Sequence, residues 1–263
     1  MLQRFLRDSF LLPAVYLGII LFTCTNCESI PLNTLIQAES PAEIGSTLEQ
    51  IVSTIPEKKT ILFEAMKNND TFPLFPLSDV IKTSIFTEHQ GITYFVFSKK
   101  SDKPDTHNFY LGAQQEKLVW DYGVIAYGNN DNLEQMAFKT IHLGNQKEAF
   151  KIEGFCGAMC PVVVYFDLSE KAPAVLLRVE QSAFESDIDH DGISEIIGCW
   201  GMPSTCNIYR VNNSKVTSTD INKLLGALNV KYRPESSSFV ANFSNLEKQF
   251  EYIIENGELK INK

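Results

Sequence analysis

The sequence has little positive charge. Its 23 lysine and arginine residues are outnumbered by 32 aspartates and glutamates, which gives the 263-residue chain a formal net charge of −9 at pH 7. No basic stretch carries interleaved aromatic residues, and an acidic protein repels a phosphate backbone. The composition therefore argues against nucleic acid as a partner.

The sequence also lacks the motifs of the common catalytic sites. It has no Gly-x-Ser-x-Gly elbow, no Walker loop and no His-Glu-x-x-His helix. The histidines are scattered along the chain and adjoin no obvious nucleophile; they are His89, His107, His142 and His190. We therefore predict no catalytic residues and no residues that bind an organic cofactor, and expect that the protein is not an enzyme.

The apolar run at the N-terminus is too short to cross a bilayer comfortably, since a spanning helix needs about 20 apolar residues. It extends from Phe10 to Phe22, and Arg4 and Arg7 precede it. A charged segment followed by a short apolar one is the pattern of a secretory signal. We predict a signal peptide over residues 1–23 and an exported protein.

The end of this run, Leu21-Phe22-Thr23-Cys24, resembles the lipobox of bacterial lipoproteins. The resemblance implies acylation of Cys24 and a membrane-anchored lipoprotein at the bacterial cell envelope, in the periplasm or at the cell surface. Cys27 is a second candidate for acylation, and ordinary signal cleavage is the alternative. The polar, proline-interrupted residues 24–59 would form a lipid-anchored linker to a folded domain over residues 60–263.

Short segments rich in β-branched and aromatic residues follow the linker, and Gly and Asn turn signals separate them. Examples are Ile92–Phe97, Pro161–Leu168 and Ser194–Trp200. Ile221–Leu228 has a helical pattern, with Asp220 placed to cap it. We predict a mostly β domain, an irregular β-propeller-like or sandwich fold of many short antiparallel strands with one or two short helices. A regular propeller is not predicted, because no blade-length repeat has a strong signature.

One acidic segment has a spacing that demands a particular chemistry, Asp187-Ile188-Asp189-His190-Asp191-Gly192-Ile193-Ser194-Glu195. Crowded carboxylates repel one another, and a hard cation that takes six to eight oxygen ligands removes the conflict. Gly192 occupies the sixth position, where calcium loops turn sharply. We predict that Ca²⁺ binds to the carboxylates of Asp187, Asp189, Asp191 and Glu195 and to the backbone carbonyl of Ile193. A solvated acidic turn without a metal is the alternative.

This loop is no standard EF-hand, because its twelfth position is Gly198 rather than glutamate. The pattern Asp-x-Asp-x-Asp-Gly-x-x-Glu, followed by a strand-like run, resembles the calcium loop of FG-GAP and VCBS-type repeats, known from integrin-like β-propellers. The resemblance covers about a dozen residues. It implies calcium binding and says little about function.

Four cysteines lie in the β-rich part of the chain, at Cys156, Cys160, Cys199 and Cys206. An even set in an exported protein implies disulfides, although the sequence does not decide the connectivity. Each neighbouring pair lies across a predicted hairpin, so we favour Cys156–Cys160 and Cys199–Cys206. A four-thiolate zinc site, whose usual spacing these residues fit poorly, and free thiols are the alternatives.

These features predict an exported, lipid-anchored recognition module with a structural calcium site and an unidentified protein or cell-envelope partner. Two alternatives stay open. The layout is similar to that of periplasmic inhibitors or immunity proteins against lysozyme-like enzymes, whose basic surface an acidic protein would attract. A calcium-dependent hydrolase could use Glu195 and Asp187 beside the ion, although calcium is a weak Lewis acid compared with zinc.

Overall fold

The computed structural model describes residues 55–66, 72–102, 108–128, 133, 136–144, 147–155, 161–243 and 248–262. The chain divides into two compact units, Met1–Ile51 and Val52–Lys263, and every described residue belongs to the second. The predicted signal peptide, both acylation candidates and most of the predicted linker therefore lie outside the described residues. Within the described part, no helix has the length and apolar character needed to cross a bilayer.

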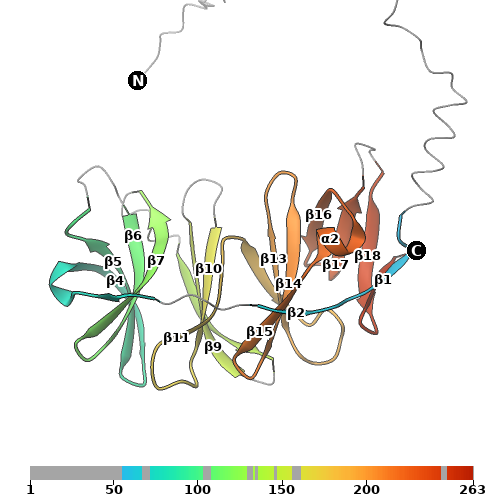
Figure 1. The fold of residues 1–263 in the computed structure, drawn as a ribbon. Coiled ribbons are helices and arrows are strands. Elements are labelled where there is room, and N and C mark those ends of the chain that lie inside the picture. Colours follow the sequence, from blue (N-terminus) through green and yellow to red (C-terminus); the bar gives the residue numbers. More distant parts are fainter. Residues whose placement is uncertain are drawn as a thin grey trace, which may run out of the picture. The chain divides into compact units, whose positions relative to one another are not determined.

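Most of the described structure is antiparallel β-strand, which confirms the predicted fold class (Figure 1). Four sheets follow one another along the chain, and each is built on four strands that are consecutive in sequence. We call each set of four consecutive antiparallel strands a meander. The strands are β4 (Val80–His89), β5 (Ile92–Lys99), β6 (Asn108–Gln115) and β7 (Leu118–Tyr127) in the first sheet; β8 (Ala137–Leu143), β9 (Lys147–Phe155), β10 (Pro161–Asp167) and β11 (Ala174–Val179) in the second; β12 (Ser182–Ser186), β13 (Glu195–Trp200), β14 (Thr205–Asn212) and β15 (Lys215–Asp220) in the third; and β16 (Asn229–Arg233), β17 (Ser238–Asn242), β18 (Phe250–Glu255) and β19 (Glu258–Ile261) in the fourth.

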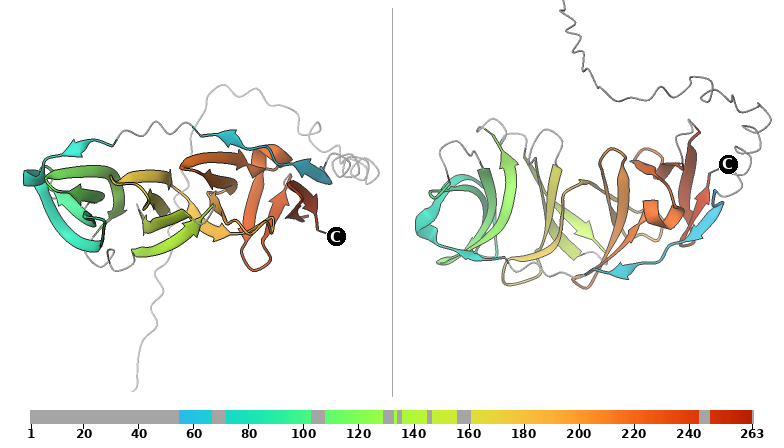
Figure 2. Two further views of the ribbon diagram at one scale, coloured as in Figure 1. Left: turned by 90° about the horizontal axis from the view of Figure 1, so that it is seen from below. Right: turned by 45° about the horizontal axis from the view of Figure 1, so that its top comes forward.

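The segment before the first meander adds an outer strand to three of these sheets (Figure 2). Its strands are β1 (Lys58–Thr60), β2 (Glu64–Ala65) and β3 (Leu74–Phe75). They pair antiparallel with β19, β15 and β7, the fourth meander strand of the fourth, third and first sheets. Strand β1 begins before residue 60, so the folded part reaches into the predicted linker.

One short α-helix occurs in the described part, together with the 3₁₀ turn η2 (Leu77–Asp79). Helix α2 covers Ile221–Leu225, and the Asp220 side chain caps it by accepting a hydrogen bond from the Lys223 N–H at 3.0 Å. Gly226 ends the helix at φ 72°, a left-handed conformation that suits glycine. The helix is therefore three residues shorter than predicted, because its C-cap precedes Leu228.

Strand β10 is buried at every position, because the sheets on both sides cover it. Val162, Val164 and Phe166 pack in a core with residues of the first sheet. The intervening Val163 and Tyr165 pack in a second core with residues of the third sheet. Side chains alternate between the two faces of a strand, so a continuous apolar run is what a sheet between two cores requires.

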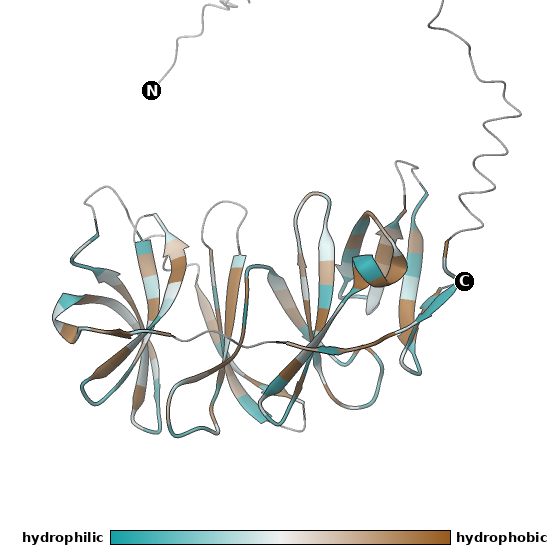
Figure 3. Cartoon of the chain, in the orientation of Figure 1, coloured by the Kyte–Doolittle hydropathy of each residue, from teal (hydrophilic) through white to brown (hydrophobic). Residues whose placement is uncertain are grey.

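The third sheet has the same two-sided burial. On β13, Ile196 faces the core shared with the second sheet, and Ile197 faces the core shared with the fourth sheet. The latter core includes Phe239 and Tyr252 from the fourth sheet. Hydrophobic residues run along the strands of the sheets, and hydrophilic ones mark many of the hairpin turns (Figure 3).

The first sheet curls strongly, and a small core of its own includes Phe95 and Phe97 (Figure 2). Register shifts in the β4–β5 and β6–β7 pairings interrupt its ladders. A Cβ atom at Gly112 would lie 3.0 Å from ring atoms of both phenylalanines. Glycine at this position therefore lets the two rings pack against the β6 backbone.

A buried carboxylate links the second sheet to the β14–β15 turn of the third. Asp167 forms an ion pair with Lys147 at 2.5 Å and accepts hydrogen bonds from the Ser169 N–H and from the Ser214 hydroxyl. Burial opposes ionisation of Asp167, but the hydrogen bonds outweigh it and hold the pKa below its usual value. The ionised form is therefore the one that the fold stabilises.

We expect Asp167 to contribute to acid unfolding. Its pKa is lower in the folded than in the unfolded chain, so its carboxylate stabilises the fold above the unfolded pKa of about 4. This contribution is lost as the pH falls through the folded pKa. Asp167→Asn should lower the free energy of unfolding at neutral pH by about 1–3 kcal/mol. It should also flatten the acid side of a urea-unfolding series, whereas Glu180→Gln, at an exposed acid, should leave that side unchanged.

Candidate metal centre

The acidic loop connects β12 to β13 in the third sheet. Ser186 pairs with Glu195 across this hairpin, so Glu195 is the first residue of β13. Gly192 has φ 85°, and no atom lies within 4 Å of a Cβ placed there. The left-handed backbone, and not a lack of space, is therefore what favours glycine at this position.

The loop binds its own backbone N–H groups with its carboxylates. Asp187 accepts hydrogen bonds from the N–H of Asp191 at 3.1 Å and from that of Gly192 at 3.0 Å. Glu195 accepts from the N–H of Ile188 at 3.2 Å. These contacts fold the loop so that side chains separated by up to eight positions point to one place.

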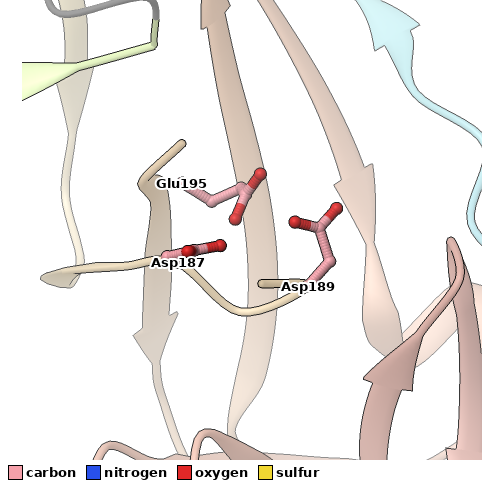
Figure 4. A group of neighbouring side chains, drawn as sticks. All are labelled: Asp187, Asp189 and Glu195. Carbon is pink, nitrogen blue, oxygen red and sulfur yellow. The ribbon is translucent and has the colours of Figure 1, made fainter. Parts of the chain in front are cut away.

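Three of the predicted ligands come together. Carboxylate oxygens of Asp187, Asp189 and Glu195 all lie within 4.8 Å of one another (Figure 4). Glu195 is 1% exposed, whereas Asp187 and Asp189 are half-buried. We call these three side chains the carboxylate group.

Asp191, the fourth predicted carboxylate ligand, is placed differently. Asp191 is exposed and is not part of the carboxylate group. Its carboxylate accepts a hydrogen bond from the N–H of Ile193 at 2.8 Å. This contact engages the Asp191 carboxylate within the local turn, and ligation by the Ile193 carbonyl stays a prediction.

A cation from the neighbouring strand contacts two members of the carboxylate group. Arg210 on β14 donates from Nε to Glu195 at 3.0 Å and from Nη2 to Asp189. Its guanidinium also lies over the ring of Phe63, with the Cζ atom 4.4 Å from the ring centroid. Phe63 belongs to the segment between β1 and β2, so Arg210 joins that segment to the candidate site.

One guanidinium does not neutralise this site. Three carboxylates and one arginine leave a formal charge of −2. Burial, and then the charge of Asp189, raise the pKa of Glu195 to about 7, although Arg210 and the Ile188 N–H oppose the shift. A raised carboxyl pKa means that the site, chiefly through burial, disfavours the ionised form of Glu195. The carboxylate group can therefore gain from a further cation.

The donor set fits a hard divalent cation. The ligand atoms that converge are all carboxylate oxygens, which Ca²⁺ and Mg²⁺ prefer, and no cysteine or histidine belongs to the group. Asp187, Asp189 and Glu195 are the residues that would hold such an ion. Three protein carboxylates are fewer than the six to eight oxygens that calcium takes, so backbone or water oxygens would complete the shell.

The sequence analysis did not identify Arg210 as part of the site, although the register of the predicted cysteine hairpin indicates its position. Cys199 pairs with Cys206 across the β13–β14 hairpin. Counting four residues outward from each cysteine leads to Glu195 and Arg210, which face each other in an antiparallel register. The favoured cysteine hairpin therefore already placed an arginine opposite the innermost acidic residue.

The structure contains the Cys199–Cys206 disulfide, with the two Cα atoms 4.2 Å apart. It joins the two strands that carry Glu195 and Arg210. These cysteines are therefore not free thiolates for a zinc site. Cys156 and Cys160, the other favoured pair, lie outside the described residues.

Comparison of the chain with known protein families, with curated proteins and with solved structures finds no match. The resemblance to FG-GAP and VCBS-type repeats therefore depends on the loop residues alone. The geometry of the site, and not kinship, has to support any proposed function.

We expect Arg210 to substitute in part for the cation. Arg210→Met should lower the free energy of unfolding in the presence of a chelator by about 1–3 kcal/mol, because two carboxylates lose a hydrogen-bonding partner. Added calcium should recover more stability in this variant than in the parent protein. The measurement is urea unfolding with and without calcium, and Lys231→Met, at an exposed cation on β16, is the control. An equal calcium effect in Arg210→Met and the parent would contradict this role.

Proposed function

We propose that the protein is an exported, lipid-anchored cell-envelope protein whose β domain binds calcium for structural reasons and acts as a recognition module. The convergence of Asp187, Asp189 and Glu195, with ligand oxygens within 4.8 Å, is the observation that carries the calcium part. Their residual negative charge and the raised pKa of Glu195 support it. The acidic pattern of the loop in the sequence agrees with this geometry.

A structural role for the ion follows from where its ligands lie. Asp187 follows the end of β12, and Glu195 begins β13. An ion that binds both would hold the two ends of this hairpin together. Two neighbouring sheets share their cores with the third sheet, so an ordered hairpin here supports the packing on both of its faces.

A recognition role has more support than catalysis. A hydrolase would need a pocket at Glu195, with a second carboxylate or His142 beside it. Two cavities in the described part of the chain, of about 360 and 350 Å³, have neither Glu195 nor His142 in their linings. Export and lipid anchoring rest on the sequence, through the charged start, the short apolar run and the Leu21–Cys24 lipobox pattern.

Calcium should stabilise the folded protein. A ligand that binds only the native state raises the free energy of unfolding by about 2.7 kcal/mol at a concentration one hundred times its dissociation constant. We expect a chelator to lower the melting temperature of the parent protein, and Asp189→Ala to abolish the difference. Thermal unfolding followed by circular dichroism, with and without calcium, measures both effects.

The matched control for this experiment is Glu180→Gln, which removes an exposed carboxylate outside the group. It should keep the full calcium shift. If the parent protein melts at the same temperature with calcium and with chelator, the calcium site is refuted. The proposal of an exported recognition module would remain, but without a calcium site.

Acylation has an independent test. Mass spectrometry of the mature protein, made in a bacterium, should find an N-terminus that begins with a lipid-modified Cys24. Cys24→Ser should remove the added mass and release the protein from the membrane fraction. A modified Cys27 would move the anchor by three residues, and an unmodified N-terminus would overturn lipid anchoring while leaving export in place.

A further inference from the structure

The cavity of about 350 Å³ lies beside β12, and none of its lining residues belongs to the carboxylate group. This volume is within the range of small-molecule sites. Three sheets supply its walls, and six of its lining residues are Lys139, Lys151, Glu153, Phe184, Glu185 and Tyr232. Among the described strands, β8, β12 and β16 each pair on one side only, so the pocket lies where the free edges of three sheets meet.

The charged residues of the pocket neutralise one another. The Lys151 ammonium, on a side chain that is 2% exposed, contacts Glu185 at 2.7 Å and also Glu153. Lys139 contacts the second oxygen of Glu185 at 2.9 Å. Two lysines and two glutamates leave no formal charge. An ion of either sign would have to break one of these pairs to bind, which disfavours a charged ligand.

The free edge of β12 is closed to an added strand. Lys151 donates a hydrogen bond to the backbone carbonyl of Ala183 at 2.9 Å. A strand that paired with this edge would need that carbonyl as its own acceptor. An extended peptide is therefore a poor occupant, and a small molecule is favoured.

Two aromatic side chains complete the pocket. Phe184 is 38% exposed, although it is a large apolar residue, and its ring centroid lies 5.9 Å from that of Tyr232. The Tyr232 side chain is nine-tenths buried, and within the described structure its hydroxyl has no hydrogen-bond partner. Because this oxygen is closed to solvent, a ligand in the pocket would meet the aromatic rings and not the Tyr232 hydroxyl.

We propose that this pocket binds a neutral sugar. Each sugar hydroxyl donates one hydrogen bond and accepts others, so it can bind a glutamate and a lysine of the paired network without separating their charges. The apolar C–H face of the ring would lie on Phe184, beside the largely buried ring of Tyr232. The inference goes beyond the calcium site and assigns a ligand class to the recognition module.

The pocket can be tested with soluble saccharides. Saturation-transfer NMR would screen glucose, galactose, mannose, N-acetylglucosamine and their β-1,4-linked disaccharides, and calorimetry would measure the dissociation constant of any that bind. We expect at least one to bind the parent protein. Phe184→Ala should weaken it about tenfold, and Lys139→Met, which removes a hydrogen-bond donor from the pocket lining, about fivefold. Phe155→Ala, at an exposed phenylalanine elsewhere on the second sheet, should leave the affinity unchanged.

Near-ultraviolet circular dichroism would establish that each variant is folded, and Lys139→Met, at a side chain that is 54% exposed, keeps the test valid if Phe184→Ala fails to fold. Sugar binding should persist in a chelator, because none of the pocket residues belongs to the carboxylate group. This separates failure of the pocket from failure of the calcium site. The proposal is overturned if no saccharide binds the folded parent protein, if both pocket variants bind normally, or if binding requires calcium.

Discussion

Burial of the second and third sheets on both faces is the constraint from which the rest of the structure follows. Strands between two cores must present apolar side chains at odd and even positions alike, as β10 does. Charged groups can then enter only with a partner. Lys151 has Glu185, Asp167 has Lys147 and Glu195 has Arg210. The possible chemistry of this protein is therefore concentrated in buried ion pairs along the margins of the two central sheets.

Much of the fold could be predicted from local sequence. Runs such as Ile92–Phe97 are β-branched and aromatic, and they form strands close to the expected bounds. The acidic loop and the strand that follows it were also predicted, because turn residues and carboxylates act over short distances. Asp191 differs from its neighbours because its carboxylate binds the next turn, a local competition that residue spacing does not reveal.

What escaped prediction depends on contacts between distant residues. Strand β4 has two register shifts, so its apolar residues do not alternate regularly, and the polar run of β12 has no strong strand pattern. The four-fold succession of meanders is a property of backbone pairing, and it leaves no recurring residues to detect. Pairing of the short β1 with β19, 198 residues beyond it in the case of Thr60 and Glu258, has no sequence signature either.

The outer strands contributed by the N-terminal segment have a mechanical consequence. Tension applied to the chain ahead of residue 56 would first reach the hydrogen bonds that the Pro56 and Glu57 carbonyls accept from the fourth sheet and the three residue pairs between β1 and β19, and only afterwards β2 and β3. The fourth sheet would thus lose its outer strand before any meander is disturbed. A protein pulled from this end would unfold in steps, because the short outer strands would detach from their sheets before the longer strands separate.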